Sequence, residues 1–583
     1  MHLDAFSAIE MPSFKLISLA AIFGIGYLLL TSIIGFKILS IIDLRSKPLS
    51  GDLKSSLALI TGVLAHACAV AALLLIAPSG IKYVAFTMPL IIIFSWRRSI
   101  LDFRACRKEI IATSLYGLVC FFVIIGYHYG AGRGENLFWS IFKLAFVSPG
   151  DSPQGLLQAQ YLFYGNSLQD FKNFSIFDRP FLGGLISLGA LSFIDKMPGN
   201  EFNSYKTKEI YFYVALWIWL NSGVIIAIIS LIKMHANKCA GAGAYFIVLA
   251  SPAIVLNVIG TWPKLFAVYI IFCAAFLMFH GFWSAGVFLS GVSFLTHGSF
   301  LWAHLSICGL LTLYVWTVER ELSYRYVRAA GVMFLAAIFP ALWFWAEHRF
   351  EAVSPLRLYY LYGVSVSYGL HHSVEEIARG FYTSTTPANI SALPFINLLK
   401  GLLPYEILRW LATSSYTSGD FSWRDFATSL FFTQANRPAF GFCLTGGFLA
   451  VLGITRQAKN NWRLSLSLCA FFLLPLIPGM GIYRRDDHFV LGIMLFSLIP
   501  LIIAVAIGLQ EVSRRGLIIA VVFSSLEYAA VYASRYPSIR FSGEFLEYYL
   551  WLIMAVLLFG SVAALSYVTR SPLTKLICHR RRC

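Results

Sequence analysis

The residues 211–232 read YFYVALWIWLNSGVIIAIISLI, a run without a single charged side chain. As an α-helix, a run of this length extends about 33 Å, which is enough to cross the hydrocarbon core of a bilayer, about 30 Å thick. Inside lipid every backbone N–H and C=O must find a partner within the protein, which an α-helix provides. The run therefore predicts a transmembrane helix.

The whole chain has the same character. Its 583 residues are 58% hydrophobic and 13% charged, with a mean hydropathy of +0.73, whereas soluble domains average about 25% charged residues. Too few charged side chains are present to cover a soluble surface. We predict an all-α, polytopic membrane protein without a separate soluble domain.

Runs of similar length recur along the chain and give about 15 predicted spans, where a span needs about 20 apolar residues. They are residues 16–41, 56–77, 80–96, 110–128, 211–232, 241–260, 264–280, 283–296, 298–317, 328–346, 440–455, 463–482, 488–508, 516–534 and 549–568. Residues 1–13, ahead of the first run, hold no Lys or Arg, and no small-residue cleavage site follows that run. We therefore interpret the first run as an uncleaved span.

The net charge of +17 comes from short basic clusters between the apolar runs rather than from one basic face. This pattern argues against nucleic acid as a partner and for topology signals. Every second connection is basic, and these connections are predicted to be cytoplasmic. Their basic residues are Arg45, Lys47, Lys54, Arg97, Arg98, Arg104, Arg107, Lys108, Lys233, Lys238, Arg320, Arg325, Arg328, Arg456, Lys459, Arg463, Arg514, Arg515, Arg580, Arg581 and Arg582.

The opposite, outer side then receives two long segments, and long connections of this kind usually have a function. The predicted organisation has five parts: a four-span segment, a first outer (periplasmic) segment with amphipathic helices, a central bundle, a second outer segment, and a C-terminal bundle with a basic tail. These parts are residues 1–128, 129–210, 211–346, 347–439 and 440–583. We expect the protein in a bacterial inner (plasma) membrane, with the lipid bilayer as its first partner.

Polar residues in the first outer segment are candidates for chemistry. Asp151 lies in a Pro/Gly-rich turn before the amphipathic stretch 155–165, which suits a helix lying along the membrane surface. Asp178-Arg179-Pro180 precedes another apolar helix. Asp178 fits either an N-cap or a functional carboxylate, and Asp151 either a turn residue or a functional one.

Residues 151–184 resemble the GT-C superfamily, the multi-span glycosyltransferases that use polyprenyl-phosphate sugars. The resemblance rests on Asp151, the stretch Ala159–Leu162, Gly165, and Arg179-Pro180-Phe181-Leu182. The family pattern has paired carboxylates and a second proline, where this chain reads Asp-Ser-Pro and Pro-Phe. The match extends over this one segment.

The resemblance implies transfer of a sugar from a polyprenyl-phosphate donor to a glycan, lipid or protein acceptor at the outer face. Asp151, with Asp178, would be catalytic, as a general base that accepts the acceptor's proton or as the partner of a divalent metal such as Mg²⁺ or Mn²⁺. Neither the cysteines nor the His/Glu spacings predict a zinc site or a disulfide framework.

The leaving lipid phosphate gains charge, so cationic side chains are expected to bind it. Candidates are Arg179, Lys264 in Thr-Trp-Pro-Lys, and the adjacent Arg484 and Arg485, with His488 beside them. Arg535 and Arg540 are further candidates in the last outer connection. The alternative is that the arginine pair belongs to a connector neutralised by Asp486 and Asp487. His488 either caps the following helix or faces the cavity.

Two histidine-containing stretches have alternative interpretations. His297 interrupts an apolar run in Thr-His-Gly-Ser, either as a substrate-binding residue or as part of a hydrogen-bonded turn. In the stretch 371–379, His and Glu can share a helical face as metal ligands, but a solvated helix start fits better because further ligands are missing.

The alternative function is a transporter or flippase for lipid-linked oligosaccharide, or an O-antigen-polymerase-like protein. A transporter predicts polar groups near the middle of several spans. Most predicted spans lack them, and charge gathers at one face. The sequence therefore favours chemistry at the membrane surface.

Overall fold

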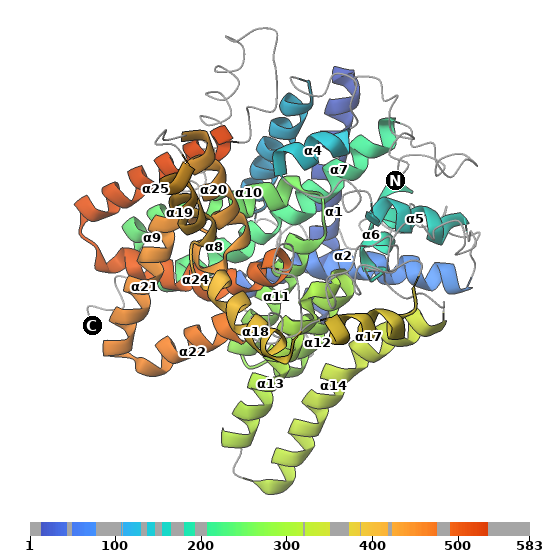
Figure 1. Cartoon of the computed structure of the whole chain (residues 1–583). Coiled ribbons are helices and arrows are strands. Elements are labelled where there is room, and N and C mark those ends of the chain that lie inside the picture. The colour runs from blue at the N-terminus through green and yellow to red at the C-terminus, as the bar shows by residue number, and fades with distance from the viewer. Residues whose placement is uncertain are drawn as a thin grey trace, which may run out of the picture.

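The computed structural model describes most of the apolar runs. The described residues are 13–43, 49, 51–76, 107, 109–129, 137–145, 154–164, 180–192, 207–318, 321–349, 372–384, 386–417, 423–474 and 490–534. Every regular element within them is an α- or 3-10 helix (Figure 1), so the all-α prediction is confirmed for this part of the chain. The predicted spans 80–96 and 549–568 lie outside it.

Seven helices among the described residues are long and apolar enough to cross a membrane, or eight if one bent pair counts as a span. The seven are Phe14–Ile42 within α1 (Phe14–Asp43), Leu53–Ile76 within α2 (Gly51–Ile76), Glu109–Tyr129, Glu209–His235 across α7 (Thr207–Ser222) and α8 (Val224–His235), Gly298–Thr317 across η5 (Gly298–Phe300) and α13 (Leu301–Val318), Ser323–Trp345 within α14 (Leu322–Arg349), and Arg514–Tyr532 within α25 (Arg514–Ser534). Membrane-spanning helical character is thus established for this chain.

The bent pair and several shorter helices account for further predicted runs. They are α9 (Lys238–Leu249), α10 (Pro252–Ile259), α11 (Lys264–Phe279), α12 (Trp283–Thr296), α21 (Cys443–Asn460), α22 (Trp462–Leu473) and α24 (Val490–Glu511). Apolar helices of 10–17 residues, such as the one in α12, fall short of a full span by length.

Each of the two segments between the bundles contains helices. The first holds α4 (Leu137–Ala145), α5 (Gln154–Tyr164) and α6 (Leu182–Leu191). The second holds α17 (Val374–Ser384), α18 (Pro387–Leu402), α19 (Tyr405–Thr417) and α20 (Trp423–Asn436), followed by η6 (Pro438–Phe440).

The helix pair α7–α8 forms the centre of the molecule. In the most apolar stretch of this pair, 94% of the residues are buried, whereas in the corresponding stretches of α14 and of α25, 22% are buried. Trp217 and Trp219 are among the largest fully buried side chains. In Figure 1, α13 and α14 instead extend away from the body of the protein.

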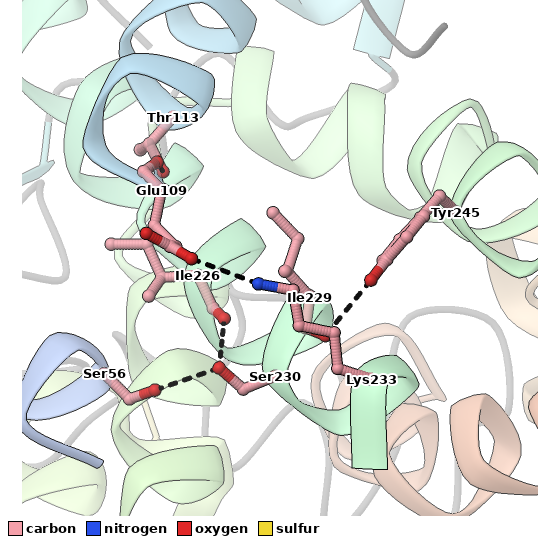
Figure 2. Close-up of polar contacts among 8 residues, drawn as sticks. All are labelled: Ser56, Glu109, Thr113, Ile226, Ile229, Ser230, Lys233 and Tyr245. Carbon is pink, nitrogen blue, oxygen red and sulfur yellow. Dashed lines mark hydrogen bonds and ion pairs between the residues drawn. The ribbon is translucent and has the colours of Figure 1, made fainter. Parts of the chain in front are cut away.

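Polar contacts attach α8 to its neighbours, as Figure 2 shows. Ser230 lies 3.4 Å from Ser56 of α2, and Lys233 donates to Glu109 over 3.1 Å. The Tyr245 hydroxyl of α9 lies 3.5 Å from the Ile229 carbonyl. These contacts hold the first residue of helix Glu109–Tyr129 beside the last turn of α8.

Small residues permit two close helix crossings. A Cβ on Gly35 of α1 would lie 1.7 Å from the Ala58 carbonyl oxygen of α2. A Cβ on Gly453 of α21 would lie 2.1 Å from the Ala504 carbonyl oxygen of α24. Such crossings are typical of membrane helices, where close backbone approach provides the packing.

The predicted span 241–260 is not one straight helix. Its axis bends by 49° between α9 and α10, at Ser251-Pro252, because proline cannot donate to the preceding turn. Four side-chain hydroxyls donate hydrogen bonds to backbone carbonyls at the end of α9. They donate from Tyr528 to Ile247 O, from Ser251 to Val248 O over 2.7 Å, from Tyr116 to Leu249 O over 2.6 Å, and from Tyr532 to Ala250 O over 2.9 Å.

Two local predictions for the first of the two segments between the bundles, residues 129–210, need correction. Helix α6 begins at Leu182 with Phe181 at its N-cap, so the helix starts later than a cap at Asp178 requires. Of the stretch 155–165, residues 155–164 do form a helix, α5, but the side chains from Gln154 to Ala159 are buried. They pack against α6 and α7: Gly155 lies beside Tyr213, and Gly184 beside Gln158.

Candidate functional site

Of the predicted site residues, Lys264 and His297 lie among the described residues. Asp151, Asp178, Arg179, Arg484, Arg485 and His488 lie outside them, as do Arg535 and Arg540.

His297 ends α12 and precedes η5. Its Nδ1 lies 2.7 Å from Ser299 Oγ and accepts from the Ser299 amide over 3.3 Å, while its ring stands edge-on to Phe300. These contacts within a few residues are those of a hydrogen-bonded turn. A role in substrate binding stays a prediction.

Lys264 is the first residue of α11 and is buried, with 6% of its surface exposed. Its Nζ lies 3.2 Å from the centre of the Trp262 ring, a cation–π contact that stabilises a buried ammonium group. Residues 260–264 connect α10 to α11, and we call them the Lys264 turn.

Asn221 of α7 fixes the Lys264 turn. Its Nδ2 donates to Trp262 O over 2.9 Å, and its Oδ1 accepts from the Phe266 amide over 3.0 Å. One side chain thereby bonds both a turn carbonyl and a first-turn amide of α11, groups that helix ends leave unsatisfied.

The Lys264 turn also holds polar groups that have no hydrogen-bond partner in the described part of the chain. The Thr261 hydroxyl and the Trp262 indole Nε1 are buried, and no described residue forms a hydrogen bond with either. Thr261 has φ 53°, a left-handed conformation that is costly for a β-branched residue. Strained backbone at this level, about 1–3 kcal/mol, is concentrated at functional sites in proteins.

A second buried cation was missed by the sequence reasoning. Arg437, just after α20, is 5% exposed. Its Nε donates to Glu406 Oε2 over 3.0 Å and its Nη2 pairs with Glu406 Oε1, a two-pronged pairing of the strong kind. The guanidinium also lies 5.6 Å from the centre of the Tyr405 ring. No described residue accepts a hydrogen bond from Nη1.

Glu527 lies close to this pair, inside α25. Its carboxylate accepts from the Leu444 amide over 2.7 Å and from the Thr445 amide over 3.1 Å, and Gln434 Nε2 lies 3.5 Å away. The carboxylate therefore caps the N-terminus of α21, where negative charge is stabilising. We call Glu406, Thr433, Gln434, Arg437, Thr445 and Glu527 the Arg437 network.

Backbone strain occurs beside the Arg437 network too. Cys443, the first residue of α21, has φ 69°. Thr261 and Cys443 are the two non-glycine residues with positive φ in the described part of the chain. One therefore lies in the Lys264 turn and the other beside the Arg437 network.

Helix α10 links the Lys264 turn to the helices that carry the Arg437 network. Leu256 of α10 packs with Ile407 of α19, with Leu430 and Phe431 of α20, and with Val531 of α25. The Lys264 turn follows directly from the end of α10.

Glu527 had a signal in the sequence, because a carboxylate within an apolar run is a functional candidate by default. Arg437 and Glu406 had none, since each lies in a polar segment.

The start of α6 reaches the same region. A Cβ on Gly183 would lie 3.8 Å from Pro263 of the Lys264 turn, and equally close to Trp217 of α7. Pro180, which directly follows Asp178 and Arg179, is buried. The segment that carries Asp178 and Arg179 thus leads into α6, which starts beside the turn that holds Lys264.

Within the stretch 371–379, the described residues 372–379 form a solvated helix start, as the sequence favoured. Ser373 and Glu376 bond each other's backbone amides, over 2.9 and 3.2 Å, at the beginning of α17. This arrangement is a capping box. Among the described residues, no group of three His, Cys, Asp or Glu side chains could hold a metal ion.

Comparisons of the chain with protein-family models, with curated proteins and with solved structures found no match.

Proposed function

We propose that this protein is a membrane transferase that moves a sugar from a polyprenyl-phosphate donor to a glycan, lipid or protein acceptor. The proposal includes about 15 spans, two long segments on the outer face, and a bacterial inner membrane. The observation that supports it best is the position of α6. The helix that follows Asp178 and Arg179 starts beside the Lys264 turn.

Lys264 is suited to the donor phosphate. Its ammonium group is buried over the Trp262 ring, and the Trp262 indole N–H and the Thr261 hydroxyl of the same turn lack partners among the described residues. Amide groups at the start of α11 add positive potential at the same place. Together they provide several donors for the charge that develops on the leaving phosphate.

In this proposal a carboxylate accepts the proton of the acceptor hydroxyl as that oxygen attacks the anomeric carbon. Asp151 is assigned this role from the resemblance, with Asp178 as its partner. The Arg437 network has a structural role in this proposal. It joins α19 to the end of α20, α20 to α25 through Gln434 and Glu527, and α25 to α21, and so positions the second predicted outer segment over the membrane helices.

The test is sugar transfer by the purified protein with a panel of polyprenyl-phosphate sugars. Asp151→Asn should reduce turnover to a few per cent or less, since general-base assistance contributes about 10² to 10⁴ in rate. Glu375→Gln, on the exposed face of α17, is the control and should transfer normally. Absence of transfer by the unaltered protein with every donor would contradict the proposal.

A transporter or flippase is the second candidate, because the bent pair α9–α10 resembles the discontinuous helices of transporters. In those proteins the carbonyls at the break bind the cargo or its ion. Here hydroxyl groups of three tyrosines and one serine already bond the last three carbonyls of α9 and that of its C-cap residue Ala250. Movement of a fluorescent lipid-linked oligosaccharide across proteoliposomes, without transfer, would support this candidate instead.

A further inference from the structure

A cavity of about 610 Å³ lies between the start of α12, the end of α13 and the start of α14. Its volume is within the range of about 300–1,000 Å³ that is usual for small-molecule sites. It shares no residue with the Lys264 turn or the Arg437 network.

The inner wall of the cavity is apolar. Val287 of α12 and Leu311 of α13 are buried, and Leu335 of α14 packs against them. Gly331 of α14 also lines the cavity, and a Cβ built on it would meet nothing within 4 Å. A larger side chain at position 331 would therefore enter open space.

The rim is aromatic and basic. Trp283 and Tyr314 line it as a stacked pair, with ring centres 5.0 Å apart. Arg328 also lines the cavity, and its guanidinium lies 6.0 Å from the centre of the Tyr324 ring. Trp and Tyr beside a basic residue are typical of the level where lipid head groups begin.

The surroundings indicate which ligand fits. Only 33% of the apolar window of α13 and 22% of that of α14 is buried by protein, so the two helices offer their apolar surface to lipid. The basic residues at their connection place this end on the predicted cytoplasmic side. Basic pockets between membrane helices on that side bind anionic head groups.

We propose that this cavity binds one anionic phospholipid of the bilayer. An acyl chain lies along Val287, Leu311 and Leu335, and the phosphate lies at Arg328 between the aromatic side chains. Arginine suits this role because its guanidinium donates two parallel hydrogen bonds to a phosphate group. The site is independent of the proposed transferase activity.

The test is native mass spectrometry of the full-length protein, titrated with phosphatidylglycerol or with zwitterionic phosphatidylcholine. Gly331→Leu fills the cavity, and Gly309→Leu is its control, because Gly309 of α13 also faces open space but does not line the cavity. Arg328→Gln removes the rim charge. Arg325→Gln is the control for charge, because Arg325 lies over Trp316 and not at the cavity.

We expect one tightly held phosphatidylglycerol on the unaltered protein and on both controls. Gly331→Leu should lose it, and Arg328→Gln should weaken it about fivefold, to the level of phosphatidylcholine. All variants should keep the thermal unfolding midpoint of the parent. Equal retention by Gly331→Leu and Gly309→Leu would overturn the proposal. So would a dimer that dissociates with Gly331→Leu and holds no lipid, because a second copy would then occupy the cavity.

Discussion

Arg437, just after α20, and Glu406 of α19 form a buried ion pair in which Arg437 Nε donates to Glu406 Oε2 over 3.0 Å. Their side chains are 6% and 18% exposed. Burying two charges is costly unless they pair with good geometry, and removing one partner leaves the other charge unpaired. The pair therefore fixes how α19 meets the end of α20.

We predict that Arg437→Met or Glu406→Gln alone destabilises the protein by about 3–5 kcal/mol. The double variant should be less destabilised than the sum of the two, because neither charge is then left unpaired. Unfolding in detergent, followed by the melting transition, measures both. The exposed pair Glu375–Arg379 is the matched control, and Glu375→Gln should leave the midpoint unchanged. Additive effects of Arg437→Met and Glu406→Gln would show that the pair is not coupled.

Lys264→Met keeps the length of the side chain but removes its charge. If Lys264 contacts the donor phosphate, the lost interaction of about 2 kcal/mol lowers donor affinity about thirtyfold. The measurement is binding of the lipid-phosphate donor to the purified variant. Lys233→Met is the control, because Lys233 pairs with Glu109 at the other, predicted cytoplasmic end. Normal donor binding by Lys264→Met would move the phosphate site to Arg484 and Arg485.

Two glycines of α1 should respond oppositely to alanine. A Cβ on Gly35 would lie 1.7 Å from a carbonyl oxygen of α2, so Gly35→Ala must separate the helices and cost about 1–3 kcal/mol. A Cβ on Gly26 would meet nothing within 4 Å, so Gly26→Ala should be neutral or stabilising. Thermal unfolding compares the two, and equal midpoints would exclude a tight α1–α2 crossing.

The stability of the capping box at the start of α17 should depend on pH. The backbone amide of Ser373, followed by its hydroxyl, holds the pKa of Glu376 below its ordinary value of 4.5. Because the folded pKa is the lower one, this stabilisation is complete above pH 4.5 and is lost as pH falls through the depressed pKa. Carbon-13 NMR of the carboxyl group should give a midpoint below 4.5. Ser373→Pro, which lacks the amide donor, should raise that midpoint; an unchanged value would assign the shift to another cause.

The topology predicted from the basic connections places Arg107, Arg325 and Arg581 on one side and Asp151, His371 and Arg484 on the other. The Lys233–Glu109 contact is consistent with it, because it joins the end of one span to the start of another at a predicted cytoplasmic end. Cysteine substitution at these positions, with an impermeant label applied to intact cells, tests the assignment. Labelling of positions 371 and 325 from the same side would contradict it.

The sequence by itself determined that this is an all-helical membrane protein. Long uncharged runs such as 211–232 leave the backbone one way to satisfy its hydrogen bonds in lipid, so hydropathy alone locates the helices. The interruption at His297 and the helix start near Ser373 were also readable, because turns and caps are formed by neighbouring residues.

Only the tertiary structure decided which helices form the core and which polar residues meet. Buried α7–α8 and the exposed α14 are both apolar, because lipid and protein interior are both apolar surroundings for a helix. No alternation of polar and apolar residues therefore marks the face that packs. The contacts of Glu527 with Leu444 and of Arg437 with Glu406 join residues far apart in the chain. Such pairs arise from helix packing, which the local hydropathy that locates each helix does not encode.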